Sequence, residues 1–184
     1  LEGRAYTPQQ AELIASAQTP HNALATEIAH AAGLRAHELL TLCPVAERAA
    51  DPRPALDSKW KGRSGEIYTV QGKGGLTREV MIPHELAARL EERRLDAPQV
   101  VTDRGVFYQS SYDIGGGQRW SNSVSAASER TMGRSTGAHG LRHSYAQERM
   151  TELQNRGLSR DAALETVSQE MGHFRPEITE TYLR

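Results

Sequence analysis

The sequence predicts a mainly α-helical domain with one small antiparallel β-hairpin, an α+β arrangement. Apolar residues recur at helical spacing along most of the chain, as in Leu24, Ile28 and Ala31. One stretch, residues 66–82, instead alternates on both sides of a glycine-rich turn, which is the pattern of two paired strands. The chain has 184 residues, enough for a domain with its own core, so we expect one domain over residues 1–184.

Capping residues and glycines indicate where the helices begin and end. Thr7 followed by Pro8 is a typical helix start, because the threonine side chain accepts from the first turn and proline loses no hydrogen bond there. Gly33, Gly157 and Gly172 each follow a helical pattern and are typical of helix ends. The helices predicted on these grounds cover approximately residues 8–17, 22–32, 34–42, 84–95, 121–132, 139–156, 159–172 and a short segment from residue 176.

Alternating residues predict the strands. Glu66–Gln71 and Thr77–Ile82 flank Gly72-Lys73-Gly74-Gly75, a sequence suited to a tight turn, and form the predicted hairpin. Prolines and consecutive glycines predict loops. The remaining segments are therefore expected as a loop at 49–61, a short strand at 100–108, and loops at 110–118 and 133–138.

Composition limits the classes of protein that the chain can represent. No apolar run approaches the length of a membrane span, so we expect no membrane partner. A single cysteine, Cys43, excludes an internal disulfide framework and a zinc site built on cysteines, and it fits a reducing cytoplasm. The net charge of −1 and a pI near 6.7 are unusual for a dedicated nucleic-acid binder.

The charge distribution says more than the total. Residues 119–160 contain seven arginines and only three glutamates, so this segment is locally basic. Arginine suits planar, bidentate recognition of phosphate, although a solvated helix face explains the same pattern.

The densest group of functional side chains is His139-Gly140-Leu141-Arg142-His143. On a helix, His139, Arg142 and His143 share one face. A zinc site is disfavoured, because the metalloprotease pattern needs glutamate where Gly140 stands and because Arg142 would repel a cation. Core histidines remain an alternative, but an anionic partner such as phosphate explains the whole set better.

Three further stretches carry weaker signals. Met171-Gly172-His173 is followed by Tyr182, and Gly33-Leu34-Arg35 leads into Glu38. Lys73 stands at the tip of the predicted hairpin. Each has an ordinary structural explanation when taken singly: a surface tyrosine, an arginine in water, or a lysine in a solvated turn.

The order and spacing of these four stretches resemble the catalytic domain of the tyrosine recombinase (phage integrase) family. The resemblance extends from Thr7 to Tyr182, and its most specific stretch is His139-Gly140-Leu141-Arg142-His143-Ser144-Tyr145-Ala146. It implies a tyrosine recombinase catalytic-domain-like fold. It also implies the active-centre residues Arg35, Lys73, His139, Arg142, His173 and Tyr182.

The resemblance implies a chemistry for these residues. Tyr182 would attack a DNA phosphate and form a 3′-phosphotyrosine, which conserves the phosphodiester energy without ATP. Arg35 and Arg142 would stabilise the charge of the transition state, so no metal or cofactor is expected. His139 and His173 would add hydrogen bonds and share proton transfer, and Lys73 would protonate the leaving 5′-oxygen.

The resemblance also implies partners and context. Double-stranded DNA would be the substrate of a homo-tetramer on paired sites, with an accessory directionality factor as a further partner, in the bacterial cytoplasm or nucleoid. Arg119, Arg130 and Arg134 are candidate DNA contacts. An N-terminal DNA core-binding domain and a C-terminal tail, usual in the family, are expected to be absent from this chain.

The predicted function is that of a site-specific recombinase or integrase of a mobile element. A resolvase of chromosome or plasmid dimers would use the same chemistry and stays open. A type IB topoisomerase is disfavoured by the small size of the chain. A non-catalytic DNA-binding module on the same fold is a further alternative, although such a module would not need Tyr182.

Overall fold

The computed structural model describes residues 3–72, 74–173 and 175–184. Its helices are α1 (Pro8–Ser16), α2 (Pro20–Ala32), the 3₁₀ helix η1 (Glu38–Thr41), α3 (His84–Glu91), α4 (Gly117–Met132), α5 (His139–Asn155), α6 (Arg160–Met171), α7 (Pro176–Glu180) and the 3₁₀ helix η2 (Thr181–Leu183). Its strands are β1 (Cys43–Pro44), β2 (Glu66–Gln71), β3 (Thr77–Ile82), β4 (Arg94–Asp103) and β5 (Val106–Tyr112). The predicted class, mainly α with small antiparallel β structure, is confirmed.

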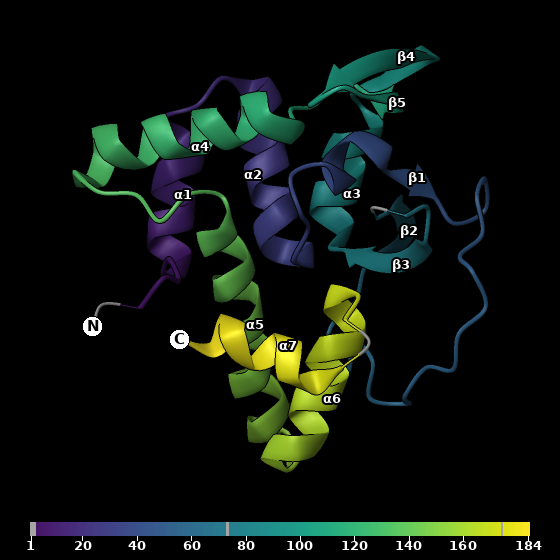
Figure 1. Ribbon diagram of the computed structural model, residues 1–184, viewed down its shortest axis with the longest axis vertical. Helices are drawn as coiled ribbons and strands as arrows, with labels where there is room; N and C mark the ends of the chain where they lie inside the picture. Colours follow the sequence, from purple (N-terminus) through teal and green to yellow (C-terminus); the bar gives the residue numbers. More distant parts are fainter. Residues whose placement is uncertain (1–2, 73, 174) are drawn as a thin grey trace.

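The helices enclose the core, and the strands lie to one side of them (Figure 1). Helix α4 packs across α1 and α2, while α5 packs between α2 and α6. One apolar cluster joins the N-terminal helices to the sheet through residues such as Ile28 and Val70, and a second lies between α5 and α6 around Leu153 and Val167. Helix α5 therefore begins beside one core and ends in the other.

Three of the predicted helix boundaries rest on the expected caps, whereas α4 begins at Gly117, inside the loop predicted at 110–118. Thr7 and Gln10 form a capping box, in which each side chain bonds the other residue's backbone N–H. Gly33 and Gly172 end α2 and α6 with φ values of 70° and 81°, a left-handed conformation that glycine adopts without steric cost. The two chain ends lie near each other, where the Arg4 backbone N–H donates to the Arg184 carbonyl over 3.4 Å.

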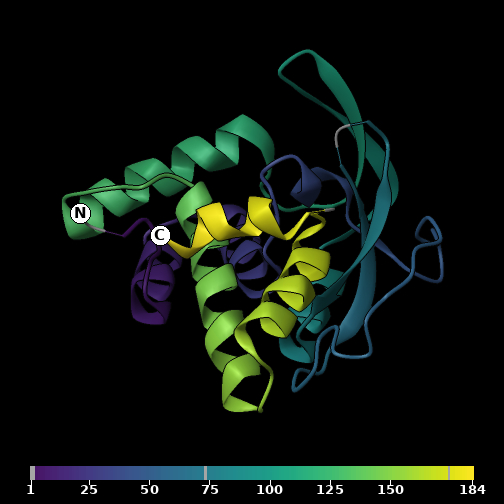
Figure 2. The ribbon, with the colours of Figure 1, turned by 60° about the horizontal axis from the view of Figure 1, so that its bottom comes forward.

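The structure corrects the prediction of a single hairpin. Beside the three-stranded sheet β1-β2-β3, strands β4 and β5 form a second, two-stranded ribbon, which extends away from the helices (Figure 2). Helical spacing through Arg94 predicted a helix to residue 95, but α3 ends at Glu91. The Asp113 N–H then donates to the Arg93 carbonyl over 2.8 Å, so the chain has already turned into the ribbon.

The segment after Gly33 also differs from its prediction. The expected helix over 34–42 is a single 3₁₀ turn, η1, and β1 pairs with β2 directly afterwards. The Thr41 hydroxyl accepts the Gln71 N–H over 2.9 Å, which ties the end of η1 to the sheet. Pro44 cannot continue a helix, and here it lies in an edge strand.

Within the part of the chain that the structure describes, no helix combines the length and the apolar character needed to cross a membrane.

Candidate active site

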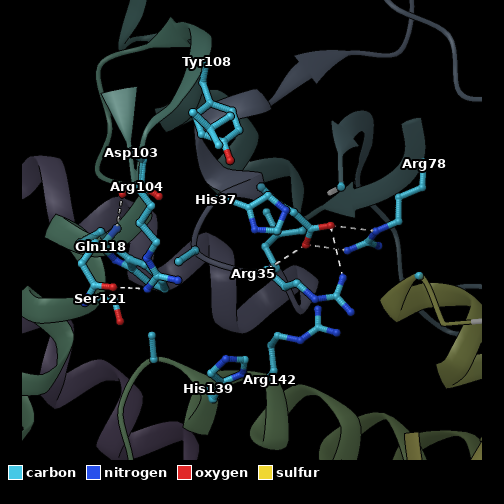
Figure 3. A pocket seen from close by; sticks show the side chains of 18 of the residues that line it. Arg35, His37, Arg78, Asp103, Arg104, Tyr108, Gln118, Ser121, His139 and Arg142 are labelled. Atoms are coloured by element: carbon cyan, nitrogen blue, oxygen red, sulfur yellow. Dashed lines mark hydrogen bonds and ion pairs between the residues drawn. The ribbon is translucent and has the colours of Figure 1, made fainter. Parts of the chain in front are cut away.

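A cleft of about 730 Å³ opens between η1, the start of α5, the end of α6 and the β4–β5 ribbon (Figure 3). Among the described residues, the charged side chains that line it are four arginines and two carboxylates: Arg35, Arg78, Arg104, Arg142, Glu38 and Asp103. The cleft therefore carries a net positive charge, although the whole chain has a net charge of −1. Such a concave, positively charged surface attracts anions.

The turn at Gly33 places Arg35 in the cleft. Gly33 has a φ of 70°, and a Cβ atom there would lie 2.8 Å from the ring of Tyr145, so both conformation and space require glycine. Two residues later, the Arg35 backbone N–H donates to Glu38 Oε1 over 2.8 Å. The Arg35 guanidinium forms an ion pair with the other carboxylate oxygen at 3.6 Å. Glu38 thus binds both the backbone N–H and the guanidinium of Arg35.

Glu38 is fully buried and organises the cations of the cleft. Arg78 donates to both of its carboxylate oxygens, from Nε over 3.2 Å and from Nη2 over 2.9 Å. Burial alone would raise the pKa of Glu38, but the guanidiniums of Arg78 and Arg142 lower it to about 2. Glu38 is not among the site residues that the sequence predicts, because in the sequence it is one more charged residue beside Arg35 and His37.

Arg142 projects from the first turn of α5 and is only 1 % exposed. Its guanidinium donates to the carbonyl of Gly33, to the carbonyl of Met171 over 3.5 Å and to Nε2 of His173 over 3.1 Å. Burial, followed by the charge of Arg35, lowers the pKa of Arg142 to about 10, so the guanidinium stays charged at neutral pH. It links the ends of α2 and α6 at the floor of the cleft.

The hydrogen bonds of His173 define its tautomer. A guanidinium only donates, so Nε2 accepts from Arg142 and the proton lies on Nδ1, which donates to the Thr179 hydroxyl over 2.8 Å. Burial, followed by the charges of Arg142 and Arg35, lowers the pKa of His173 to about 3. In this arrangement His173 is a neutral side chain that orients Arg142.

This neutrality can be tested by NMR. We expect the imidazole signals of His173 to keep their neutral-form shifts from pH 8 down to about pH 5, because an unperturbed histidine would titrate near pH 6.5. The measurement is a ¹⁵N and ¹³C titration of the imidazole, with a His173→Gln variant to assign the signals. A midpoint near pH 6.5 for His173 would contradict the geometry.

Tyr182 lies on η2, against the same group of side chains. Its ring stacks on His173 with centroids 5.4 Å apart, and it lies 4.9 Å from the ring of His143. The guanidinium carbon of Arg142 is 5.1 Å from the centre of the tyrosine ring. Gln147, one turn after His143 on α5, donates to the Tyr182 carbonyl over 3.2 Å. Helix α5 therefore holds the segment that carries Tyr182.

The structure brings most of the predicted site residues together. Arg35, His139, Arg142 and His173 all line the cleft. Tyr182, although described, is not part of the lining and packs against Arg142 and His173. His139 is exposed at the start of α5, where partial burial and then Arg142 lower its pKa.

Lys73 lies outside the described residues, so its predicted place at the hairpin tip and its role stay predictions. The other five residues form the geometry on which the proposal below depends.

The three candidate DNA contacts lie elsewhere. None of Arg119, Arg130 and Arg134 is among the described residues that line the cleft. Arg119 is exposed on α4, Arg134 is half-buried, and Arg130 donates to the Ala17 carbonyl at the end of α1 over 2.7 Å. The basic segment also contains Arg149, which is completely buried in an ion-pair network rather than solvated.

Among the described residues, no group of three or more histidine, cysteine, aspartate or glutamate side chains is arranged to hold a metal ion.

Comparisons with known proteins identify the fold. No protein-family model matches the chain, and no curated protein matches it significantly. Among solved structures, XerH site-specific recombinase bound to palindromic difH substrate in a post-cleavage complex matches 98% of this chain and 49% of its own, with a TM-score of 0.60 and 18% identity. The pre-cleavage complex of XerH with difH substrate matches 98% of this chain and 50% of its own, with a TM-score of 0.58 and 18% identity.

The integrase of transposon Tn1549 in complex with transposon right-end DNA matches all of this chain and 62% of its own, with a TM-score of 0.57 and 16% identity. The chain thus spans about half to three fifths of the length of these proteins. Its fold is that of the catalytic domains of tyrosine recombinases.

Proposed function

We propose that the chain is the catalytic domain of a site-specific DNA recombinase that cuts and rejoins DNA through a 3′-phosphotyrosine. The observation that carries the proposal is the contact of the Tyr182 ring with both Arg142 and His173 at a cleft that Arg35 and His139 also line. A tyrosine against one guanidinium, at a cleft that a second guanidinium lines, suits phosphoryl transfer in which arginines stabilise the charge of the phosphate.

The residues suggest the following division of roles. The Tyr182 oxygen forms a bond to phosphorus while the bond to the 5′-oxygen breaks, and the 5′-oxygen leaves with a proton that Lys73 is proposed to donate. Arg35 and Arg142 bind the non-bridging oxygens, whose negative charge grows in the transition state. His139 is placed at the rim to donate a further hydrogen bond or to accept the tyrosine proton.

The buried position of Arg142 adds a requirement. Only 1 % of this residue is exposed, and the ring of Tyr182 lies over its guanidinium. A phosphate in the cleft can therefore reach Arg142 only after the side chains around its guanidinium move. In this proposal, Tyr182 is one of them, and its movement carries the hydroxyl towards the phosphorus atom.

The proposal extends to the biological context. The structural neighbours are a site-specific recombinase and a transposon integrase, each in complex with DNA. This likeness supports DNA as the substrate and integration of a mobile element as the process. A homo-tetramer on paired double-stranded sites and an accessory directionality factor are proposed from the resemblance of the sequence to the family alone. Resolution of chromosome or plasmid dimers uses the same chemistry and stays the second candidate.

Replacement of Tyr182 by phenylalanine tests the chemistry. We expect the native protein to form a covalent adduct with a nicked duplex built from the junctions that flank its gene, in the presence of EDTA. The nick lets the short 5′ fragment dissociate, so the adduct accumulates and is visible on a denaturing gel. Tyr182→Phe should form none, because it lacks the nucleophilic oxygen but keeps the ring that packs on His173.

Tyr6→Phe is the matched control. The Tyr6 hydroxyl is also hydrogen-bonded within the fold, donating to the Gly137 carbonyl over 2.9 Å, but it lies outside the cleft lining. This variant should still form the adduct. Binding of the duplex without any adduct from the native protein would instead indicate a non-catalytic DNA-binding module.

A further inference from the structure

We propose that Arg104, at the tip of the β4–β5 ribbon, binds a DNA phosphate next to the one that is cleaved. It would extend the site to the wall of the cleft opposite α5. The inference rests on the proposed function in one respect, that the ligand of the cleft is a DNA strand. Of the ribbon that carries Arg104, the sequence predicted only a short strand at residues 100–108.

The first observation is the backbone conformation of Arg104. Its φ is 49° and that of Gly105 is 78°, so the two residues form a turn with both central positions in the left-handed region. The first of these positions normally favours asparagine, aspartate or glycine. An arginine is disfavoured there, so an observed arginine calls for a compensating role. Among the described residues, Trp60 is the other non-glycine residue with positive φ.

The second observation is that the tip of the ribbon is fixed to the start of α4. The Gln118 backbone N–H donates to Asp103 Oδ1 over 2.9 Å, and the Arg104 guanidinium donates to Gln118 Oε1. A Cβ atom at Gly117 would lie 2.6 Å from the Asp103 carboxylate, so helix and turn fit closely. The exposed Arg104 guanidinium is thereby bonded to Gln118 at the edge of the cleft that both residues line (Figure 3).

The third observation is that Arg104 takes part in none of the ion pairs found among the described residues. Arg35 and Arg78 are paired with Glu38, whereas the hydrogen-bond partner of Arg104 is a neutral amide. The charge of Arg104 also acts on the opposite wall of the cleft, where His139 lies. The pKa of His139 is lowered by burial first, then by Arg142, Arg4 and Arg35, and to a smaller extent by Arg104. A cleft with guanidiniums on both walls suits a strand that presents successive phosphates.

The test measures DNA affinity against salt concentration for native protein and Arg104→Asn. Asparagine suits the left-handed turn, so this variant should fold with an unchanged or higher Tm. We expect the slope of log K against log salt to fall in magnitude by about 1, with an affinity about three- to tenfold lower. Arg104→Lys, which keeps the charge, should restore most of the slope.

Arg89→Gln is the matched control. It also removes one positive charge, but Arg89 lies on α3, where it forms a bidentate pair with Glu27 outside the cleft. Its salt slope should equal that of the native protein. An Arg104→Asn slope equal to the native slope, or an equal fall in Arg89→Gln, would overturn the inference.

The adduct assay separates this inference from the proposed function. If the native protein forms the Tyr182 adduct while Arg104→Asn keeps the native slope, the recombinase proposal stands and the Arg104 inference fails. If the slope falls as expected while the native protein forms no adduct, Arg104 binds DNA and the proposed chemistry fails. If the native protein does not bind the duplex, both are overturned.

Discussion

Replacing Glu38 by glutamine is expected to destabilise the protein by about 3–5 kcal/mol at neutral pH, the usual cost of removing one partner from a buried ionic group. Glu38 has no exposed surface and accepts two hydrogen bonds from Arg78. Glutamine has nearly the same shape but no charge. Arg78, Arg35 and Arg142 would then face one another around a neutral amide.

The effect of Glu38 should depend on pH in a defined direction. The carboxyl pKa is about 2 in the folded protein, against an ordinary value of 4.5. A group whose pKa is depressed by folding stabilises the fold above its unfolded pKa and loses that contribution as pH falls through its folded pKa. The difference between these two pKa values corresponds to about 3 kcal/mol. The difference in free energy of unfolding between native protein and Glu38→Gln should therefore narrow between pH 5 and about pH 2.

Urea unfolding at a series of pH values measures this gap. Glu12→Gln is the control, because Glu12 is exposed on α1 and its loss should change stability by less than about 0.5 kcal/mol. A gap between native protein and Glu38→Gln that stays constant as pH falls would show that the charge of Glu38 is not what stabilises the cluster.

The sequence could identify the side chains that converge but not what holds them. His139 and Arg142 share a helix face by spacing alone, and the structure places both in the cleft with Arg35 and His173. Glu38 carried no comparable signal, because a buried acidic residue and an exposed one look alike in a sequence. Its burial depends on Arg78, forty residues away on β3.

The β4–β5 ribbon shows the same limit for the fold. Its strands are mostly exposed, and Phe107 is 75 % exposed, so the alternation of buried and exposed residues that predicted β2 and β3 is missing. Pro98 and a bulge between Arg94 and Gln99 interrupt the pattern further. The ribbon is fixed instead by tertiary bonds, such as the one from the Ser110 hydroxyl to the Leu40 carbonyl over 2.8 Å.

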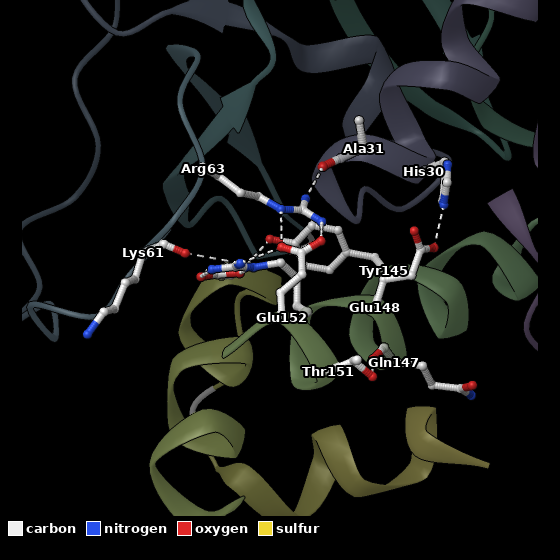
Figure 4. A network of polar contacts seen from close by, with 11 residues as sticks. His30, Ala31, Lys61, Arg63, Tyr145, Gln147, Glu148, Thr151 and Glu152 are labelled. Carbon is white, nitrogen blue, oxygen red and sulfur yellow. Dashed lines mark hydrogen bonds and ion pairs between the residues drawn. The ribbon is translucent and has the colours of Figure 1, made fainter. Parts of the chain in front are cut away.

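A second large effect is expected at the buried pair of Arg149 and Glu170. Arg149 donates to both carboxylate oxygens of Glu170 over 2.8 Å, and neither side chain is exposed. Glu170 also accepts from the Tyr145 hydroxyl over 2.6 Å, and Arg149 also donates to Glu152, which Arg63 binds in turn (Figure 4). This network joins α5, α6 and the loop before β2.

Arg149→Met should cost about 3–5 kcal/mol, because it leaves the carboxylate of Glu170 buried without a cation. Glu170→Gln should cost less, because Arg149 keeps its pair with Glu152 at 2.8 Å. The double variant removes both charges of the pair. Its loss of unfolding free energy should therefore be smaller, by about 1–3 kcal/mol, than the sum of the losses in the two single variants. Urea unfolding of the four proteins gives this coupling energy, and additive losses would show that the two residues act independently.

The same pair connects stability to the candidate site. The backbone carbonyl of Glu170 accepts from Arg78 over 2.8 Å, and the carbonyl of the next residue, Met171, accepts from Arg142. Two arginines therefore bind the end of α6: Arg78, which also binds Glu38, and Arg142, at the floor of the cleft. Because Arg142 and His173 depend on that position, we expect the double variant to fold and yet to form the Tyr182 adduct more slowly than the native protein in single-turnover measurements. An unchanged rate would mean that the cleft keeps its geometry without the buried pair.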